Sequence, residues 1–170
     1  MSAFPVLFSV TESDEPFLIE LYASTRAAEM AIVPWGDDQK RAFLKMQFEA
    51  QDRYYRERYP NASFEVIKLN ERSVGRLYQA QLADEIRIID LAFLPEHFDQ
   101  DIFIELLKEI LQKGERDEKA VRIYVEDSDA TTEIFINLGF QKIDRHGIYF
   151  LWEYKPAPLK SQAKTPVLSA

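Results

Sequence analysis

A single aspartate in the middle of an apolar strand is the first residue of this sequence that could do chemistry. Asp90 lies between Ile89 and Leu91, in a stretch from Ile86 to Leu94 that alternates as a β-strand does. A carboxylate among apolar neighbours is costly unless it is hydrogen-bonded or faces a wet cavity. Asp90 is therefore either a tuned base or acceptor-binding group, or a core carboxylate tied to a backbone amide or to an arginine such as Arg26. The sequence leaves both interpretations open.

Composition excludes several other chemistries. The chain has no Cys, which rules out disulfides, thiolate metal sites and a cysteine nucleophile. Its two histidines, His97 and His146, lie far apart without ligand spacing, so no metal is expected. We find no nucleophile elbow and no Walker loop. The net charge of -8 makes nucleic acid an unexpected partner, and it tolerates a cationic acceptor better than an anionic one.

The same features bear on the compartment and on domain number. No apolar run approaches a membrane span, and no basic residue precedes the apolar start, as it would in a signal peptide. The absence of Cys fits a reducing compartment, so we expect a cytoplasmic protein without a membrane partner. At 170 residues the chain suits one domain, which we place at 1–154. The remaining segment, Lys155 to Ala170, has three prolines and no aromatic residue, and we expect it to be mobile.

The elements that must position Asp90 can be traced from the N-terminus. We expect a strand at Val6 to Val10 and then a helix capped by Ser13 or Asp14, with Phe17, Leu18, Leu21 and Tyr22 on one face. Met30 to Gly36 is expected to be a loop. Asp37 then caps a long helix that ends at Tyr59-Pro60-Asn61. Its expected core face consists of Phe43, Met46, Gln47, Ala50 and Tyr54.

Three strands are expected to follow as an antiparallel meander, at Phe64 to Leu69, Val74 to Leu82 and Ile86 to Leu94. The spacing of Phe103, Leu106, Leu107, Ile110 and Leu111 predicts an amphipathic helix closing at Gly114. A strand at Ala120 to Val125, a helix at Thr131 to Leu138 and strands at Phe140 to Ile143 and Ile148 to Tyr154 complete the chain. The segment from Ile86 to Val125 should form a right-handed parallel crossover. The sequence thus predicts an α+β domain with a mixed, mostly antiparallel sheet and helices on both faces.

Two short motifs carry a family resemblance. Leu138-Gly139-Phe140 closes the last helix, and Leu94-Pro95-Glu96-His97 follows the central strand. With the element order, they make residues 3 to 154 similar to the GNAT (GCN5-related) N-acetyltransferases. The resemblance implies acetyl transfer from acetyl-CoA to an amine. In that family the central strand splays from its neighbour and binds pantetheine, and a glycine-containing loop offers backbone amides to the pyrophosphate at a helix N-terminus.

The loop of this chain departs from the family pattern. The matching residues run from Phe98 to Phe103, with Phe98 in place of an Arg or Gln, Asp99 and Asp101 in place of glycines, and Phe103 in place of a small residue. Two carboxylates there should repel a pyrophosphate and can cap the amides it would use. We therefore expect weak or absent acetyl-CoA binding. The resemblance places the coenzyme site at Leu91, Phe93, Asp99, Gln100, Asp101, Ile102 and Phe103.

The catalytic groups that the resemblance implies are also incomplete. Phe135 stands where the family has a proton-donating Tyr, and Ser128 stands where an Asn commonly begins that helix. Glu85 matches the position at the start of the central strand where a base is often found, although it can also be a charge at the end of a hairpin. Tyr124 and Tyr149 are conceivable substitute acids, but strand alternation favours packed sheet residues.

Position alone assigns three residues to the acceptor pocket. Arg26, Glu29 and Trp35 fall where the family's first helices line that pocket. Trp35 could cover a ligand, or it could equally plug the edge of the sheet.

Three functions remain open from the sequence. The chain could be a binding or accessory module without catalysis, which the loss of the loop glycines and of the Tyr favours. It could instead be an active acetyl-CoA-dependent N-acyltransferase acting on a small amine or a protein amino group. A third possibility is assembly, with edge strands and the C-terminal strand that bears Trp152 pairing across a homodimer.

Overall fold

The computed structural model describes residues 4–127 and 130–157. Seven strands pair in the order β1-β2-β3-β4-β5-β7-β6. The described residues of Met1–Tyr78 and Asp90–Phe98 form one compact unit, and those of Gln79–Ile89 and Asp99–Ala170 form a second. Strands β3 (Arg72–Gln81) and β4 (Glu85–Phe93) contribute to both units. Of the pairings with described register, only β4 with β5 is parallel. The predicted α+β class with a mixed, mostly antiparallel sheet is confirmed.

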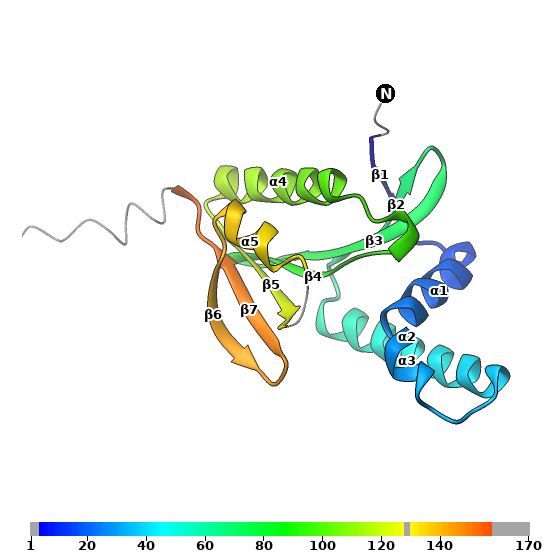
Figure 1. Cartoon of the computed structure of the whole chain (residues 1–170). Coiled ribbons are helices and arrows are strands. Elements are labelled where there is room, and N and C mark those ends of the chain that lie inside the picture. The colour runs from blue at the N-terminus through cyan, green and yellow to red at the C-terminus, as the bar shows by residue number, and fades with distance from the viewer. Residues whose placement is uncertain (1–3, 128–129, 158–170) are drawn as a thin grey trace, which may run out of the picture. The chain divides into compact units, whose positions relative to one another are not determined.

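The first unit begins with a short strand and three helices (Figure 1). These elements are β1 (Val6–Ser9), α1 (Glu15–Thr25), α2 (Ala27–Ala31) and α3 (Asp37–Arg58), followed by β2 (Ser63–Leu69). Asp14 precedes α1 as expected, but its carboxylate accepts a hydrogen bond from the backbone N–H of Thr11 at 2.8 Å. It therefore fixes the turn Glu12–Asp14 and does not cap α1 with its side chain. Met30 lies in α2, so the loop predicted from Met30 begins only after Ala31.

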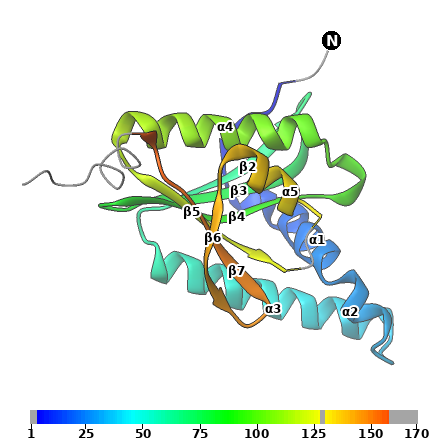
Figure 2. The same ribbon diagram turned by 60° about the vertical axis from the view of Figure 1, so that its left-hand side comes forward.

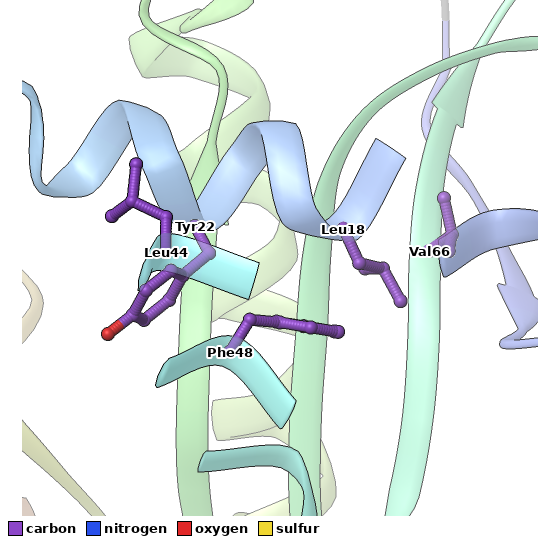
Figure 3. Close-up of a cluster of buried hydrophobic side chains, with 5 residues drawn as sticks. All are labelled: Leu18, Tyr22, Leu44, Phe48 and Val66. Carbon is purple, nitrogen blue, oxygen red and sulfur yellow. The ribbon is translucent and has the colours of Figure 1, made fainter. Parts of the chain in front are cut away.

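A hydrophobic cluster joins α1 and α3 to β2. Figure 3 shows Leu18 and Tyr22 of α1, Leu44 and Phe48 of α3 and Val66 of β2 pointing toward one another. The rings of Tyr22 and Phe48 lie 6.2 Å apart. Full burial of such side chains contributes about 1.5–3 kcal/mol each, so this cluster holds the helices to the strand.

The core face predicted for α3 is wrong. Leu44 and Phe48 are buried, whereas Met46 is 59% exposed and Tyr54 is 60% exposed. With 3.6 residues per turn, the two faces are about a third of a turn apart on the helix. Asp37 is the first residue of α3, and Gly36 occupies the cap position predicted for it.

The second unit is built around α4 (Gln100–Asp117), whose apolar residues are buried as predicted. The helix does not close at Gly114. It runs on to Asp117, and Glu118 ends it in the left-handed conformation with φ 54°. A Cβ on Gly114 would lie 2.9 Å from the carbonyl oxygen of Lys119, so this glycine lets the following chain pack closely on the helix.

The remaining elements of the second unit are β5 (Ala120–Glu126), α5 (Thr132–Leu138), β6 (Gln141–His146) and β7 (Tyr149–Tyr154). Gly139 ends α5 with φ 100°, as the sequence predicts. Strand β7 pairs with β5 on one side and β6 on the other (Figure 2), and Trp152 is only 3% exposed. The C-terminal strand is therefore paired on both sides within the chain, and the homodimer considered from the sequence stays a prediction.

The C-terminal end of β7 is fastened to α4. The Tyr154 hydroxyl donates a hydrogen bond to Oε1 of Glu115, and the backbone N–H of Ala157 donates to Oε2 at 3.0 Å. Pro156 is fully buried, so the packed chain extends past the boundary predicted at residue 154. The rest of the tail predicted to be mobile, from residue 158 onward, lies outside the described residues. Among those residues, no helix combines the length and the hydropathy that a membrane span needs.

The Tyr154–Glu115 bond predicts a specific loss of stability at high pH. Burial, together with the hydrogen bond to Glu115 and its negative charge, raises the pKa of Tyr154 to about 12, against about 10 in an unfolded chain. Because the folded pKa is the higher one, the stabilisation is complete below pH 10 and is lost as the pH rises toward 12. We expect the unfolding free energy of the wild type to fall more steeply over this range than that of Tyr154→Phe, measured by urea titration at each pH. Parallel curves for the two proteins would contradict this assignment.

Candidate functional site

The loop that follows β4 leads directly into the N-terminus of α4. Pro95–His97 form one 3₁₀ turn, and Asp99 takes the N-cap position of α4 in an extended conformation with φ −127° and ψ 119°. Its Oδ1 accepts hydrogen bonds from the backbone N–H groups of Asp101 at 2.9 Å and Ile102 at 3.2 Å. The side chain of Asp99 thus occupies two of the donors that open the helix.

The residues next to Asp99 in the loop differ in their contacts and in their exposure. The N–H of Phe103 donates to the Asp99 carbonyl at 3.0 Å, which is the first bond of the helix ladder. Asp101 adds a second carboxylate within the first turn, where it interacts favourably with the helix dipole. Gln100 is exposed, Ile102 is half-buried, and Phe98 is 44% exposed with its ring 6.0 Å from that of Phe93. The predicted capping of the amides is confirmed for Asp99.

Beneath the helix start lies an aromatic cluster. Phe103 is 4% exposed and Phe135 is 1% exposed, and their rings meet edge to face at 6.0 Å. Phe135 also contacts Phe140 at 5.3 Å and stacks on Trp152 at 6.1 Å. The position that matches the family's Tyr is therefore an apolar core position without a proton to donate. Ser128, which stands where an Asn commonly begins that helix in the family, lies outside the described residues.

Asp90 is engaged by a buried arginine of the adjacent strand β3. Arg76 donates from Nε to Oδ2 of Asp90 at 2.6 Å, and its Nη2 contacts the same oxygen. Nη2 also donates to Oε1 of Gln51 on α3 at 2.9 Å. Burial is the largest single influence and lowers the pKa of Arg76, but the charge of Asp90, its hydrogen bond and the nearby Tyr78 and Tyr55 together raise the pKa overall. Asp90 is therefore a half-buried carboxylate tied to an arginine, and that arginine is Arg76 in place of the Arg26 considered from the sequence. Its role as a base or acceptor-binding group stays a prediction.

The two residues of β4 that the resemblance assigns to the coenzyme are Leu91 and Phe93. Leu91 is half-buried and Phe93 is 9% exposed. A Cβ on Gly75 would lie 2.4 Å from the carbonyl oxygen of Ala92, and the N–H of Leu94 donates to the carbonyl of Val74 at 2.9 Å. Glycine at position 75 is thus required for the close approach of the two strands at this point.

Glu85 belongs to an ion-pair network across three strands of the second unit. Its carboxylate accepts from Nε of Arg87 at 3.1 Å and lies 3.4 Å from Nη1 of Arg122. Arg122 also binds Glu153 of β7 at 2.7 Å. Burial opposes the charge of Arg122, but its bonds with these carboxylates raise its pKa overall. The side chain of Glu85 is only 10% exposed. Its carboxylate is held by the guanidinium groups of Arg87 and Arg122.

The three residues assigned to an acceptor pocket fall into two separate contacts. Arg26 pairs with Glu29 at 3.1 Å, and its guanidinium carbon lies 5.4 Å from the centre of the Tyr22 ring. Trp35 is 37% exposed and meets Phe43 of α3 edge to face at 5.2 Å. The structure brings Arg26 and Glu29 together, and it packs Trp35 onto the helix that follows.

Tyr124 is better placed for chemistry than strand alternation suggested. The parallel pairing of β4 with β5 runs from Glu85–Ala120 to Ile88–Ile123, and Tyr124 is the next residue of β5. It is 39% exposed, with Arg87 5.4 Å from its ring centre and the His146 ring 5.5 Å away. His146 Nε2 lies 3.2 Å from Oδ2 of Asp144. Tyr149, which pairs with His146, is 40% exposed. The sequence signal for this group is the outward alternation of Arg122, Tyr124 and Glu126.

Across the ranges 4–127 and 130–157, no three His, Asp or Glu side chains gather as a metal site would require.

Comparison with known proteins identifies the fold. No family model matches the sequence, and no curated protein matches it. Solved structures do match, among them PaiA N-acetyltransferase from Thermoplasma acidophilum in complex with coenzyme A, at 18% identity and a TM-score of 0.65 over 91% of this chain and 99% of that one. A GCN5-related N-acetyltransferase from Rhodopseudomonas palustris matches at 16% identity and 0.62 over 91% and 98%. A GNAT family acetyltransferase from Elizabethkingia anophelis with acetyl-CoA bound matches at 14% and 0.57 over 89% and 97%. The chain has the GNAT fold.

The buried pair of Arg76 and Asp90 predicts a large loss of stability when one partner is removed. Asp90→Ala leaves the guanidinium buried without its carboxylate, so we expect a loss of about 3–5 kcal/mol in the free energy of unfolding. Chemical denaturation measures this loss. Glu29→Ala, which breaks the exposed pair with Arg26, should cost less than about 1 kcal/mol. A loss below that of Glu29→Ala would refute a structural role for Asp90.

The cap of α4 predicts different effects for two substitutions of Asp99. Asp99→Ala should lower the unfolding free energy by about 1 kcal/mol, whereas Asp99→Asn, which keeps an accepting oxygen, should leave it nearly unchanged. Thermal and urea denaturation compare the two. Equal losses in both variants would mean that the side-chain bonds to the amides of Asp101 and Ile102 contribute no stability.

Proposed function

We propose that this chain is a GNAT-fold binding or accessory module in which the coenzyme position is closed by the protein's own helix cap, so that acetyl-CoA binds weakly or not at all. The observation that carries the proposal is the Asp99 carboxylate on the amides of Asp101 and Ile102. A pyrophosphate bound at a helix N-terminus needs such amides free, and it gains from the positive end of the dipole. Here the carboxylate of Asp99 already accepts hydrogen bonds from both amides and lies at the positive end of the dipole.

Electrostatics supports the same proposal. Two unit charges 4 Å apart interact by about 4 kcal/mol at an effective dielectric constant of 20, so a diphosphate approaching Asp99 and Asp101 is opposed by several kcal/mol. Phe135 adds a second argument, since a buried phenyl ring at the Tyr position cannot protonate a departing thiolate. The proposed function is therefore recognition of a small amine or a protein partner without acetyl transfer.

One observation favours a second candidate, an active acetyl-CoA-dependent N-acyltransferase. Tyr124 of β5 is 39% exposed and its ring lies 5.5 Å from that of His146. In this alternative Tyr124 beside His146 takes the place of the missing acid. The PaiA and Elizabethkingia proteins bind coenzyme A or acetyl-CoA, which is consistent with this alternative.

Calorimetric titration with acetyl-CoA and with free CoA separates the two functions. We expect no saturable heat for the wild type up to about 1 mM ligand, which corresponds to a binding free energy weaker than about −4 kcal/mol. Asp99→Gly with Asp101→Gly should restore measurable affinity because it frees the amides and removes both charges. Micromolar binding by the wild type would reject the accessory function and favour the transferase.

A second double variant distinguishes occupied amides from charge repulsion. Asp99→Asn with Asp101→Asn removes the charges but keeps an accepting oxygen at the cap, so it should remain unable to bind if occupancy is the cause. Asp37→Gly with Asp38→Gly is the matched control, because it makes the same change in the first turn of α3. Binding restored in the control as strongly as in the loop variant would show that net charge alone governs affinity.

A further inference from the structure

A cavity of about 350 Å³ lies where β1 ends and β2 begins. It is lined by Ser9 and Val10, by Arg56 of α3 and by residues 62–65, which all belong to the first unit. None of them is a residue that the resemblance assigns to the coenzyme or to the acceptor. The volume is at the lower end of the range for small-molecule sites, so the cavity suits a small ligand.

The pairing of β1 with β2 fixes the polar part of the cavity. Ser9 of β1 lies directly opposite Glu65 of β2 in the antiparallel register, and the N–H of Val10 donates to the carbonyl of Phe64 at 2.9 Å. Because opposed residues share one face of a sheet, the Ser9 hydroxyl and the Glu65 carboxylate lie on the same face. Ser63 comes two residues before Glu65 in β2, so strand alternation places its hydroxyl on that face as well.

The carboxylate of Glu65 has no partner of its own. The residue is half-buried, and within the described part of the chain its carboxylate takes part in no hydrogen bond or ion pair. Burial raises the pKa of Glu65, since the surrounding protein disfavours the charged form. A carboxylate in this position gains from a bound cation, which replaces the hydrogen bonds lost with water.

The basic residue of the lining, Arg56, is already neutralised. Its Nε donates to Oδ2 of Asp52 at 3.0 Å, and its guanidinium carbon lies 4.5 Å from the centre of the Phe64 ring. Because Arg56 is paired with Asp52, the charge of Glu65 leaves the cavity negative. A ligand with a positive charge is therefore favoured over an anion.

The acceptors on this face match a primary ammonium group. Such a group carries three N–H donors, and Glu65, Ser9 and Ser63 offer a carboxylate and two hydroxyl oxygens. Val10 and Ala62 provide apolar surface for a short alkyl chain. We propose that this cavity binds the protonated form of a small primary alkylamine, with Glu65 as its anionic anchor. The inference deepens the proposed function and rests on it, since it gives the small amine of that function a site.

Titration of the isotope-labelled full chain with n-butylammonium chloride, followed by NMR spectroscopy, tests the proposal. At neutral pH this amine is protonated, because an alkylamine has a pKa close to that of Lys, about 10.4. We expect saturable shifts in the backbone amide signals of Ser9, Val10 and residues 62–65. So small a ligand should bind with a Kd on the order of 1 mM.

Substitution of the anchor separates specific binding from general attraction to an acidic protein. Glu65→Gln keeps the size of the side chain and removes its charge, so it should weaken binding roughly tenfold or more. Glu57→Gln is the matched control, because Glu57 is an exposed carboxylate of α3 outside the lining, and its affinity should be that of the wild type. The dispersion of the amide signals shows whether each variant is folded.

A second cation tests the role of the N–H donors. Tetramethylammonium has the same charge but no N–H group, so it should bind roughly tenfold more weakly or worse. Equal binding of the two cations, equal affinity of Glu65→Gln and Glu57→Gln, or no saturable shift in the wild type would each overturn the proposal. No acetyl-CoA is present in this titration, so its failure is distinct from failure of the proposed function, which the calorimetry decides.

Discussion

The carboxylate of Asp99 bonded to the amides of Asp101 and Ile102 is the interaction on which the second unit and its chemistry depend. The cap starts α4, and from its first turn onward the helix buries Phe103, Leu106, Leu107, Ile110 and Leu111. The same N–H groups cannot serve both a cap and a bound phosphate. A side chain that is always present at high effective concentration competes strongly with a free ligand for them. At the N-terminus of α4, the cap that stabilises the helix therefore lowers its affinity for a bound anion.

Phe103 and Phe135 stabilise the same region by apolar packing, in addition to the polar contacts of the cap. The sequence resemblance predicts a small residue at position 103 and a Tyr at position 135, and in the structure the two phenyl rings lie against each other in the core. A phenyl ring at position 103 buries apolar area that a small residue could not. The ring of Phe135 packs against it. Restoring a hydroxyl at position 135 would place a polar group in a fully apolar cluster, where it needs a hydrogen-bond partner.

The fold was predictable because most of its determinants are local. Helix spacing, the parallel crossover and the left-handed Gly139 all follow from short stretches of sequence, and so does the capping role of Asp99. The face of α3 was not predictable, because the spacing of Phe43, Ala50 and Tyr54 is as helical as that of Leu44 and Phe48. Which stripe packs inward depends on contacts with Leu18 and Val66. The partner of Asp90 depends likewise on the pairing of β3 with β4, and the end of α4 on the αL conformation of Glu118.

The arginines of the sheet strengthen the argument about anions. Arg76 is held by Asp90, and Arg87 and Arg122 are held by Glu85 and Glu153. A protein that binds a phosphorylated coenzyme needs amide donors or cations left free for it. The amides of Asp101 and Ile102, and the guanidinium groups of these three arginines, are engaged with carboxylates of the chain itself. Both oxygens of Glu85 are bound by guanidinium groups, whereas the contacts of Asp90 with Arg76 are made through Oδ2.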